Sequence, residues 1–304
     1  MTKPRVVCLL LLTLLTPALA QAHPSSAEAL RRIDERLESR TPPGVLYLRK
    51  GIVHRDRGEL PASLTFLNKA AAITPEDPDV AYHRALTLRA LGQPHQALDA
   101  LEQALLQKGP IANIHWARGQ VLEDLGRSAE ALRAYEQTCD HAPNIEAWLA
   151  QGRLLNEQGA PRAALDALLK GVKQTSGASV LRVEAFHLAQ RLNEPDIGVA
   201  MMTPLVEKSR LRTPWLLLRA EALQSSGKTK QAHQDRLLAL ADAERGAHKR
   251  PSALAFLRRA KARHALGDLK GAREDLKRSL RTAPHLPQAR EFEQTLDAPR
   301  RSPR

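Results

Sequence analysis

The sequence predicts an all-α solenoid of about seven helical hairpins, and three observations support this fold class. Glycine or asparagine recurs at intervals of 34, 34, 33, 34, 34 and 40 residues, a period typical of stacked helical hairpins. About 280 residues remain after an expected leader, which exceeds one compact core but suits a solenoid. Aromatic residues make up only 3% of the chain, as expected for hairpins packed on alanine and leucine.

The recurring residues are predicted to be the turns inside the hairpins, because glycine, and after it asparagine, tolerates the left-handed conformation that ends a helix. They are Gly58, Gly92, Gly126, Gly159, Asn193, Gly227 and Gly267.

Residues 1–22 are predicted to be a secretory signal peptide. Lys3 and Arg5 form a basic start, and the run from Val6 to Leu15 is apolar apart from Thr13. Small residues follow, with cleavage expected after Ala20 or Ala22. The apolar run is too short for a membrane span, although a retained anchor stays the alternative. The predicted location is therefore periplasmic or secreted.

Cysteine usage excludes a disulfide inside the mature chain. Cys8 lies within the apolar run and would leave with the leader, so Cys139 is the one cysteine that remains. It is interpreted as a small packed hydrophobe, with a reactive thiol or an intermolecular disulfide as the alternative.

Charge is divided unevenly along the chain. Residues 1–207 contain 23 Lys+Arg and 23 Asp+Glu, whereas residues 208–304 contain 23 and 10, so the whole net charge of +13 lies in the last third. This asymmetry indicates either an anionic partner or a solvated basic face.

Helical periodicity predicts the order of the remaining segments. Leu30, Ile33 and Leu37 form one apolar stripe on a first helix, and Ala289, Phe292 and Leu296 form another on a last helix, as terminal caps require. The expected organisation is an N-terminal capping helix in 23–42, repeats 1–4 in 43–177, a degenerate repeat 5 in 178–212, basic repeats 6–7 in 213–285, and a capping helix with a disordered basic tail in 286–304.

Five segments resemble tetratricopeptide (TPR) repeats, in which small, bulky and proline residues recur at fixed positions. These segments start at Gly44, Pro78, Ala112, Ile145 and Ala253. The first supplies Tyr47, Gly51, Gly58, Leu67, Ala70 and Pro75; the third supplies Gly119, Gly126, Ala131, Tyr135 and Pro143; the seventh supplies Phe256, Ala260, Gly267, Ala272, Leu276 and Pro284. The resemblance implies a right-handed superhelix with a concave binding groove.

Repeats 5 and 6 depart from the pattern. Pro204 is expected to kink or end the second helix of repeat 5. The interval from Gly227 to Gly267 is six residues too long, and the extra length is assigned to a basic turn in residues 244–251.

The sequence predicts no enzyme, no metal and no cofactor. Gly227-Lys228-Thr229 imitates a phosphate-binding loop, but Ala222 replaces the required first glycine and no strand precedes it. The 11 histidines show no metal-ligand spacing and no cysteine partners.

The resemblance also implies which side chains face the groove, at the second, fifth, ninth and twelfth positions of each repeat's first helix. These are Tyr82, Leu86, Arg89, Asn113, Trp116, Gln120, Glu123, Leu149, Arg153, Asn156, His187, Gln190, Lys261 and His264. Tyr82 and Trp116 would form an aromatic shelf beside Arg89 and Arg153, a hot-spot composition. Alternatively, Trp116 packs against the next hairpin, one register position from His115. The lysine and asparagine clamp for a terminal carboxylate is absent.

The predicted function is a protein–protein interaction scaffold in the cell envelope that binds a peptide or helix of a partner in its groove. The alternative is a tether that holds anionic lipid or polymer through the basic last third. Salt separates the two, because attraction between exposed charges is screened while apolar burial is not. Nucleic acid is not an expected partner of an exported chain.

Overall fold

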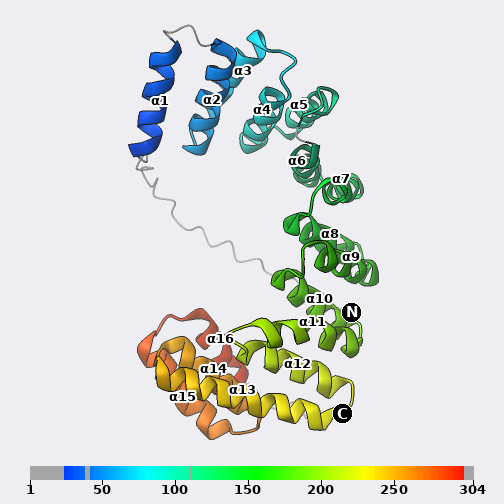
Figure 1. Ribbon diagram of the computed structural model, residues 1–304, viewed down its shortest axis with the longest axis vertical. Coiled ribbons are helices and arrows are strands. Elements are labelled where there is room, and N and C mark those ends of the chain that lie inside the picture. Colours follow the sequence, from blue (N-terminus) through cyan, green and yellow to red (C-terminus); the bar gives the residue numbers. More distant parts are fainter. Residues whose placement is uncertain (1–23, 38–41, 110, 298–304) are drawn as a thin grey trace, which may run out of the picture. The chain divides into compact units, whose positions relative to one another are not determined.

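The computed structural model describes residues 24–37, 42–109 and 111–297, which form sixteen helices and no strand (Figure 1). The chain divides into two compact units, residues 1–141 and 142–304. The first unit contains α1 (Pro24–Leu37), α2 (Pro43–Asp56), α3 (Leu60–Ile73), α4 (Pro78–Ala90), α5 (Pro94–Leu106), α6 (Ile111–Asp124) and α7 (Ser128–His141). The second contains α8 (Ile145–Glu157), α9 (Pro161–Gln174), α10 (Ser179–Arg191), α11 (Pro195–Lys208), α12 (Thr213–Ser225), α13 (Thr229–Lys249), α14 (Ala253–Ala265), α15 (Leu269–Thr282) and α16 (Pro287–Asp297).

Seven antiparallel hairpins account for fourteen of the described helices, which confirms the predicted fold class. They are α2/α3, α4/α5 and α6/α7 in the first unit, and α8/α9, α10/α11, α12/α13 and α14/α15 in the second. Within each unit, a hairpin packs chiefly on its neighbours in the chain, as in a solenoid. The predicted signal peptide and the basic tail 298–304 lie outside the described residues, among which no helix is long and apolar enough to cross a bilayer.

All seven predicted turn residues adopt the left-handed conformation. The six glycines have φ values between 72° and 87°, and Asn193 has φ 56°. In the first hairpin, the Gly58 amide donates to the Arg55 carbonyl at 2.8 Å, and the Glu59 amide donates to the His54 carbonyl at 2.9 Å. These bonds satisfy carbonyls at the end of the first helix, so the chain reverses with few unpaired groups.

Small residues let the two helices of a hairpin approach closely. A Cβ added to Gly119 would lie 2.6 Å from Cδ1 of Tyr135, and one added to Gly152 would lie 2.9 Å from Cδ2 of Leu168. Tyr135 and Leu168 are both buried. The bulky residue of the second helix therefore occupies the space that glycine leaves free on the first.

One expectation about the irregular segments is wrong, and a second is wrong in part. Residues 244–249 do not form a turn. They are the last part of α13, a helix of 21 residues in which Ala243 and Ala247 are buried. The extra length is therefore helix, because these alanines extend its packed face. Pro204 does not end α11, which runs on to Lys208. Proline removes one backbone donor there, and packing of the neighbouring Met202 and Val206 holds the helix together.

Amphipathic helices lie at both ends of the described chain, as the stripes predict. Ile33 of α1 is buried, and Ala289, Phe292 and Leu296 of α16 join the core cluster of α14 and α15. Cys139 is also buried, as its interpretation as a packed hydrophobe requires.

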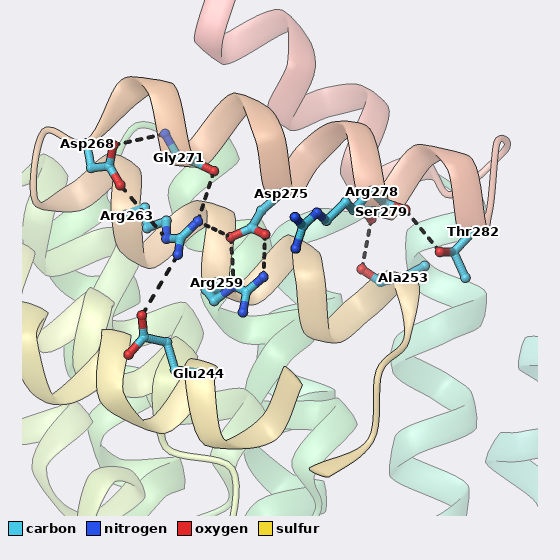
Figure 2. A network of polar contacts seen from close by, with 10 residues as sticks. All are labelled: Glu244, Ala253, Arg259, Arg263, Asp268, Gly271, Asp275, Arg278, Ser279 and Thr282. Atoms are coloured by element: carbon cyan, nitrogen blue, oxygen red, sulfur yellow. Dashed lines mark hydrogen bonds and ion pairs between the residues drawn. The ribbon is translucent and has the colours of Figure 1, made fainter. Parts of the chain in front are cut away.

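Buried ion pairs join the helices of the last two hairpins. Asp275 of α15, with a side chain only 1% exposed, accepts two hydrogen bonds from Arg259 at 2.6 and 2.7 Å and lies 2.9 Å from Arg263 (Figure 2). Arg263 also reaches Glu244 of α13 at 3.9 Å. Arg219 of α12 holds Asp235 of α13 in the same bidentate way, at 2.7 and 2.8 Å. The acidic residues of the basic third thus neutralise part of its charge inside the hairpins.

Candidate functional site

A cavity of about 570 Å³ lies between α8 and α10, the first helices of two successive hairpins of the second unit. Its volume falls in the range of ligand-binding pockets. We call it the α8–α10 pocket. It is lined by Glu146, Leu149, Ala150, Gly152, Arg153, Asn156, Leu168, Glu184, His187, Leu188 and Arg191.

The floor of the α8–α10 pocket is apolar. Leu168 of α9 is 4% exposed and Leu188 of α10 is 3% exposed, and Ala150 lies beside them. Because Gly152 has no side chain, Leu168 can pack directly against α8. The floor therefore forms only when α8, α9 and α10 pack together.

The rim of the pocket is polar and partly cross-linked. Arg191 donates to the side-chain oxygen of Asn156 at 3.3 Å, which ties the C-terminal ends of α8 and α10 together. Arg153 lies 3.3 Å from Glu157, with both side chains about half exposed. An exposed pair of this kind contributes little to stability.

Four side chains predicted to face the groove meet in this pocket: Leu149, Arg153, Asn156 and His187. Sequence reasoning missed Glu146, Glu184 and Arg191. Each lies three or four residues from a predicted position on the same helix, and residues at that spacing share a face. Extending the predicted face by one turn in each direction would have found them.

The predicted groove residues of the first unit are engaged with one another. Arg89 of α4 pairs with Asp124 of α6 at 2.5 Å and donates to Gln120 at 2.9 Å. Glu123 accepts a hydrogen bond from the Tyr135 hydroxyl at 2.6 Å. The Arg89 contacts link the successive first helices α4 and α6, whereas the Glu123–Tyr135 hydrogen bond joins α6 to α7 of the same hairpin. Arg89, Gln120 and Glu123 therefore have a structural role here.

The aromatic shelf stays a prediction, and its two rings contact different neighbours in the first unit. The Trp116 ring lies 5.1 Å from the ring of Tyr135, within its own hairpin, and is half-buried, while His115 beside it is buried. Tyr82 is half-buried next to His83, and burial raises the pKa of its hydroxyl. Leu86 is half-buried and Asn113 is exposed. Arg153, the fourth member of the proposed set, belongs to the other unit.

The remaining predicted positions lie toward the C-terminal end of the second unit. Gln190 of α10 donates to Glu221 of α12 at 3.5 Å. Lys261 lies over the ring of Phe292 at 5.7 Å, and His264 meets the same ring edge-on at 5.6 Å. Since Phe292 belongs to α16, these two side chains face the capping helix and lie apart from the α8–α10 pocket.

A second cavity, of about 620 Å³, lies between α1 and α2 of the first unit. Arg32, Arg36 and Arg49 line it, together with Ile33 and Ile52. Arg32 is already paired with Glu28 at 2.7 Å, and only Ile52 occupies a groove-facing register position. Among the described residues, no group of three or more His, Cys, Asp or Glu side chains could hold a metal ion.

Comparison with known proteins supports the predicted repeats. Residues 82–145 and 117–179 match the tetratricopeptide repeat family model. A TPR repeat-containing protein of Methanocaldococcus jannaschii is 33% identical over 93 residues, which is 30% of this chain and 29% of that protein. The chain thus matches less than a third of the length of this relative.

Two solved structures resemble this chain over most of its length. The C-terminal part of a TPR repeat-containing protein from Cytophaga hutchinsonii matches 80% of this chain and 98% of its own, with 16% identity and a TM-score of 0.57. A tetratricopeptide repeat protein from Parabacteroides merdae matches 84% and 99%, with 18% identity and a TM-score of 0.47. At these identities, the first of these structures supports the helical-repeat fold.

Proposed function

We propose that this chain is a non-enzymatic scaffold that binds a segment of another protein in the α8–α10 pocket. The observation that carries the proposal is the convergence of four groove-facing positions, Leu149, Arg153, Asn156 and His187, on one cavity with an apolar floor. Helical repeat folds offer extended surfaces for such binding, and residues 82–145 and 117–179 match a tetratricopeptide repeat model.

The pocket suits protein binding because it combines apolar area with polar groups that set orientation. Burying apolar surface of a ligand against Leu149, Leu168 and Leu188 contributes roughly 25 cal/mol per Å². Arg153 and Asn156 supply hydrogen-bond donors and acceptors at the rim. Arginine beside an apolar pocket is a frequent composition of interaction hot spots.

Peptide selection tests the proposal. Residues 23–304 would be immobilised and used to select from a phage-displayed library of random peptides, with binding of the enriched peptides measured by fluorescence anisotropy. Leu149→Glu places a charge in the pocket and should weaken the binding of the enriched peptides at least tenfold, while the circular dichroism spectrum of the protein stays unchanged. Leu237→Glu is the matched control, because Leu237 is an exposed leucine of α13 outside the pocket.

Two results would reject the assignment. Enriched peptides that bind Leu149→Glu as tightly as the parent protein would place binding elsewhere. Binding that collapses at moderate salt and ignores Leu149→Glu would indicate the basic C-terminal third instead.

Export to the cell envelope is the second part of the proposal, and the basic start, apolar run and small residues of positions 1–22 support it. The test is the mass and N-terminal sequence of the protein recovered from fractionated cells. A chain that begins after Ala20 or Ala22 in the envelope or medium is expected. A full-length chain that stays with the cytoplasm would contradict export.

A further inference from the structure

The charges around the α8–α10 pocket are sorted by sign along the helices. Glu146 lies in the first turn of α8 and Arg153 lies seven residues later. Glu184 and Arg191 repeat that separation on α10, where Arg191 is in the last turn. Because the two helices are alternate members of a hairpin stack, they run in the same direction. The acidic side chains therefore lie toward one end of the pocket and the arginines toward the other.

The acidic end carries two exposed carboxylates. Neither Glu146 nor Glu184 forms an ion pair with another described residue, and both side chains are exposed beside the apolar floor. At the other end, Arg191 holds Asn156, and Arg153 shares an exposed pair with Glu157. A ligand that brought one positive and one negative group would complement both ends at once.

We propose that the α8–α10 pocket recognises an extended segment of a partner protein in which a lysine or arginine and an aspartate or glutamate lie three residues apart. The basic side chain faces Glu146 and Glu184, and the acidic side chain faces Arg153 and Arg191. This inference rests on the proposed function and specifies the partner that the function requires.

The spacing follows from the geometry of the helices. Seven residues of α-helix span roughly 10 Å at 1.5 Å per residue. A segment in the polyproline II conformation places residues i and i+3 on one face about 9 Å apart. An extended ligand is proposed because its i, i+3 distance matches the separation of the charges along each helix.

The leucine floor favours a long basic side chain. Lysine and arginine can lay their methylene stems on apolar surface while the charged end stays in polar surroundings. Leu149 lies between Glu146 and Arg153 on α8, and Leu168 packs against Gly152. A stem laid on these leucines brings its cation to the glutamates.

Short synthetic peptides test the pairing directly. Capped nonapeptides would carry Lys-Ala-Ala-Glu or Glu-Ala-Ala-Lys at the centre. Both orders are needed because the three-residue spacing of the two charges is the same in either chain direction. Peptides with Lys-Ala-Ala-Gln, Gln-Ala-Ala-Glu and adjacent Lys-Glu are the comparisons. Binding to residues 23–304 would be measured by fluorescence anisotropy. At least one dipolar peptide should bind about tenfold more tightly than each single-charge peptide, which corresponds to 1.4 kcal/mol.

Double variants of the protein identify which end of the pocket binds the basic side chain of the peptide and which binds the acidic one. Glu146→Gln with Glu184→Gln should remove the preference for lysine and keep the preference for glutamate. Arg153→Gln with Arg191→Gln should do the reverse. Glu207→Gln, an exposed acidic residue of α11 outside the pocket, should leave both preferences intact.

The outcomes separate this inference from the proposed function. In one outcome, peptides selected from the random library lack the charge pair and yet fail to bind the Leu149→Glu variant. That result would overturn the inference and keep the pocket as a binding site. Equal binding of the dipolar and single-charge peptides would overturn it as well. Failure of the random selection to yield any pocket-dependent peptide would reject both.

Discussion

Asp275 shows how one buried side chain holds three helices of the second unit together. It accepts both hydrogen bonds of Arg259 and pairs with Arg263, which in turn contacts Glu244 of α13 and Asp268 at the start of α15 (Figure 2). Hydrogen bonding to Asp275 raises the pKa of Arg259. A buried charge is tolerated only when its partners are in place, so the network depends on each member.

Asp275→Asn should therefore destabilise the protein strongly. The substitution keeps the shape and leaves two partly buried guanidinium groups without their shared anion, and loss of one partner of a buried pair typically costs about 3–5 kcal/mol. Urea denaturation followed by circular dichroism measures the loss. Glu274→Gln, one residue away and exposed, is the control and should change the free energy of unfolding by less than about 0.5 kcal/mol.

Two glycines in helices predict opposite effects of the same substitution. Gly119→Ala should destabilise by about 1–3 kcal/mol, because its new methyl group meets the buried ring of Tyr135. Gly246→Ala should stabilise by about 0.5–1 kcal/mol, because no atom lies within 4 Å of the added Cβ and alanine favours helix. Thermal denaturation of both variants checks the signs. A stabilising Gly119→Ala would contradict the close approach of α6 and α7.

Individual helices depart from the repeat pattern without disturbing the stack. Helix α11 continues through Pro204. Helix α13 is about two turns longer than the second helices of the other hairpins, because Ala243 and Ala247 stay buried. In α11, tertiary packing overrides the local preference of proline, as it commonly does for helices whose apolar face is covered.

Pro204→Ala should stabilise α11. Alanine restores a backbone donor to the carbonyl of Ala200 and relieves the ring clash, which together are worth about 1–3 kcal/mol in a helix interior. Pro161→Ala is the matched control and should be near neutral, since Pro161 begins α9 where no intrahelical donor is needed. A melting temperature of Pro204→Ala equal to that of the parent, or lower, would contradict the predicted gain.

At the scale of the whole molecule, each described hairpin packs chiefly on its chain neighbours, so stability is expected to be local. Asp275→Asn should accelerate amide exchange in α13–α16, which share its network and core cluster. Exchange in α2–α7, within the other unit, should stay unchanged. Hydrogen exchange followed by mass spectrometry resolves the segments. Acceleration of equal size in every helix would indicate one cooperative core instead.

The sequence alone determined the all-α hairpin architecture, the seven turn positions and the capping stripes, because glycine spacing and helical periodicity are local properties of the chain. It also held a signal that was overlooked: Arg219–Asp235 and Arg259–Asp275 share a separation of 16 residues and lie 40 residues apart, the same offset as Gly227 and Gly267. Only the tertiary structure decided which groove positions meet. Arg89 and Gln120 are occupied by contacts between successive helices, while Leu149, Arg153, Asn156 and His187 line a cavity. A cavity depends on how neighbouring helices pack, and the spacing of residues along one helix does not contain that information.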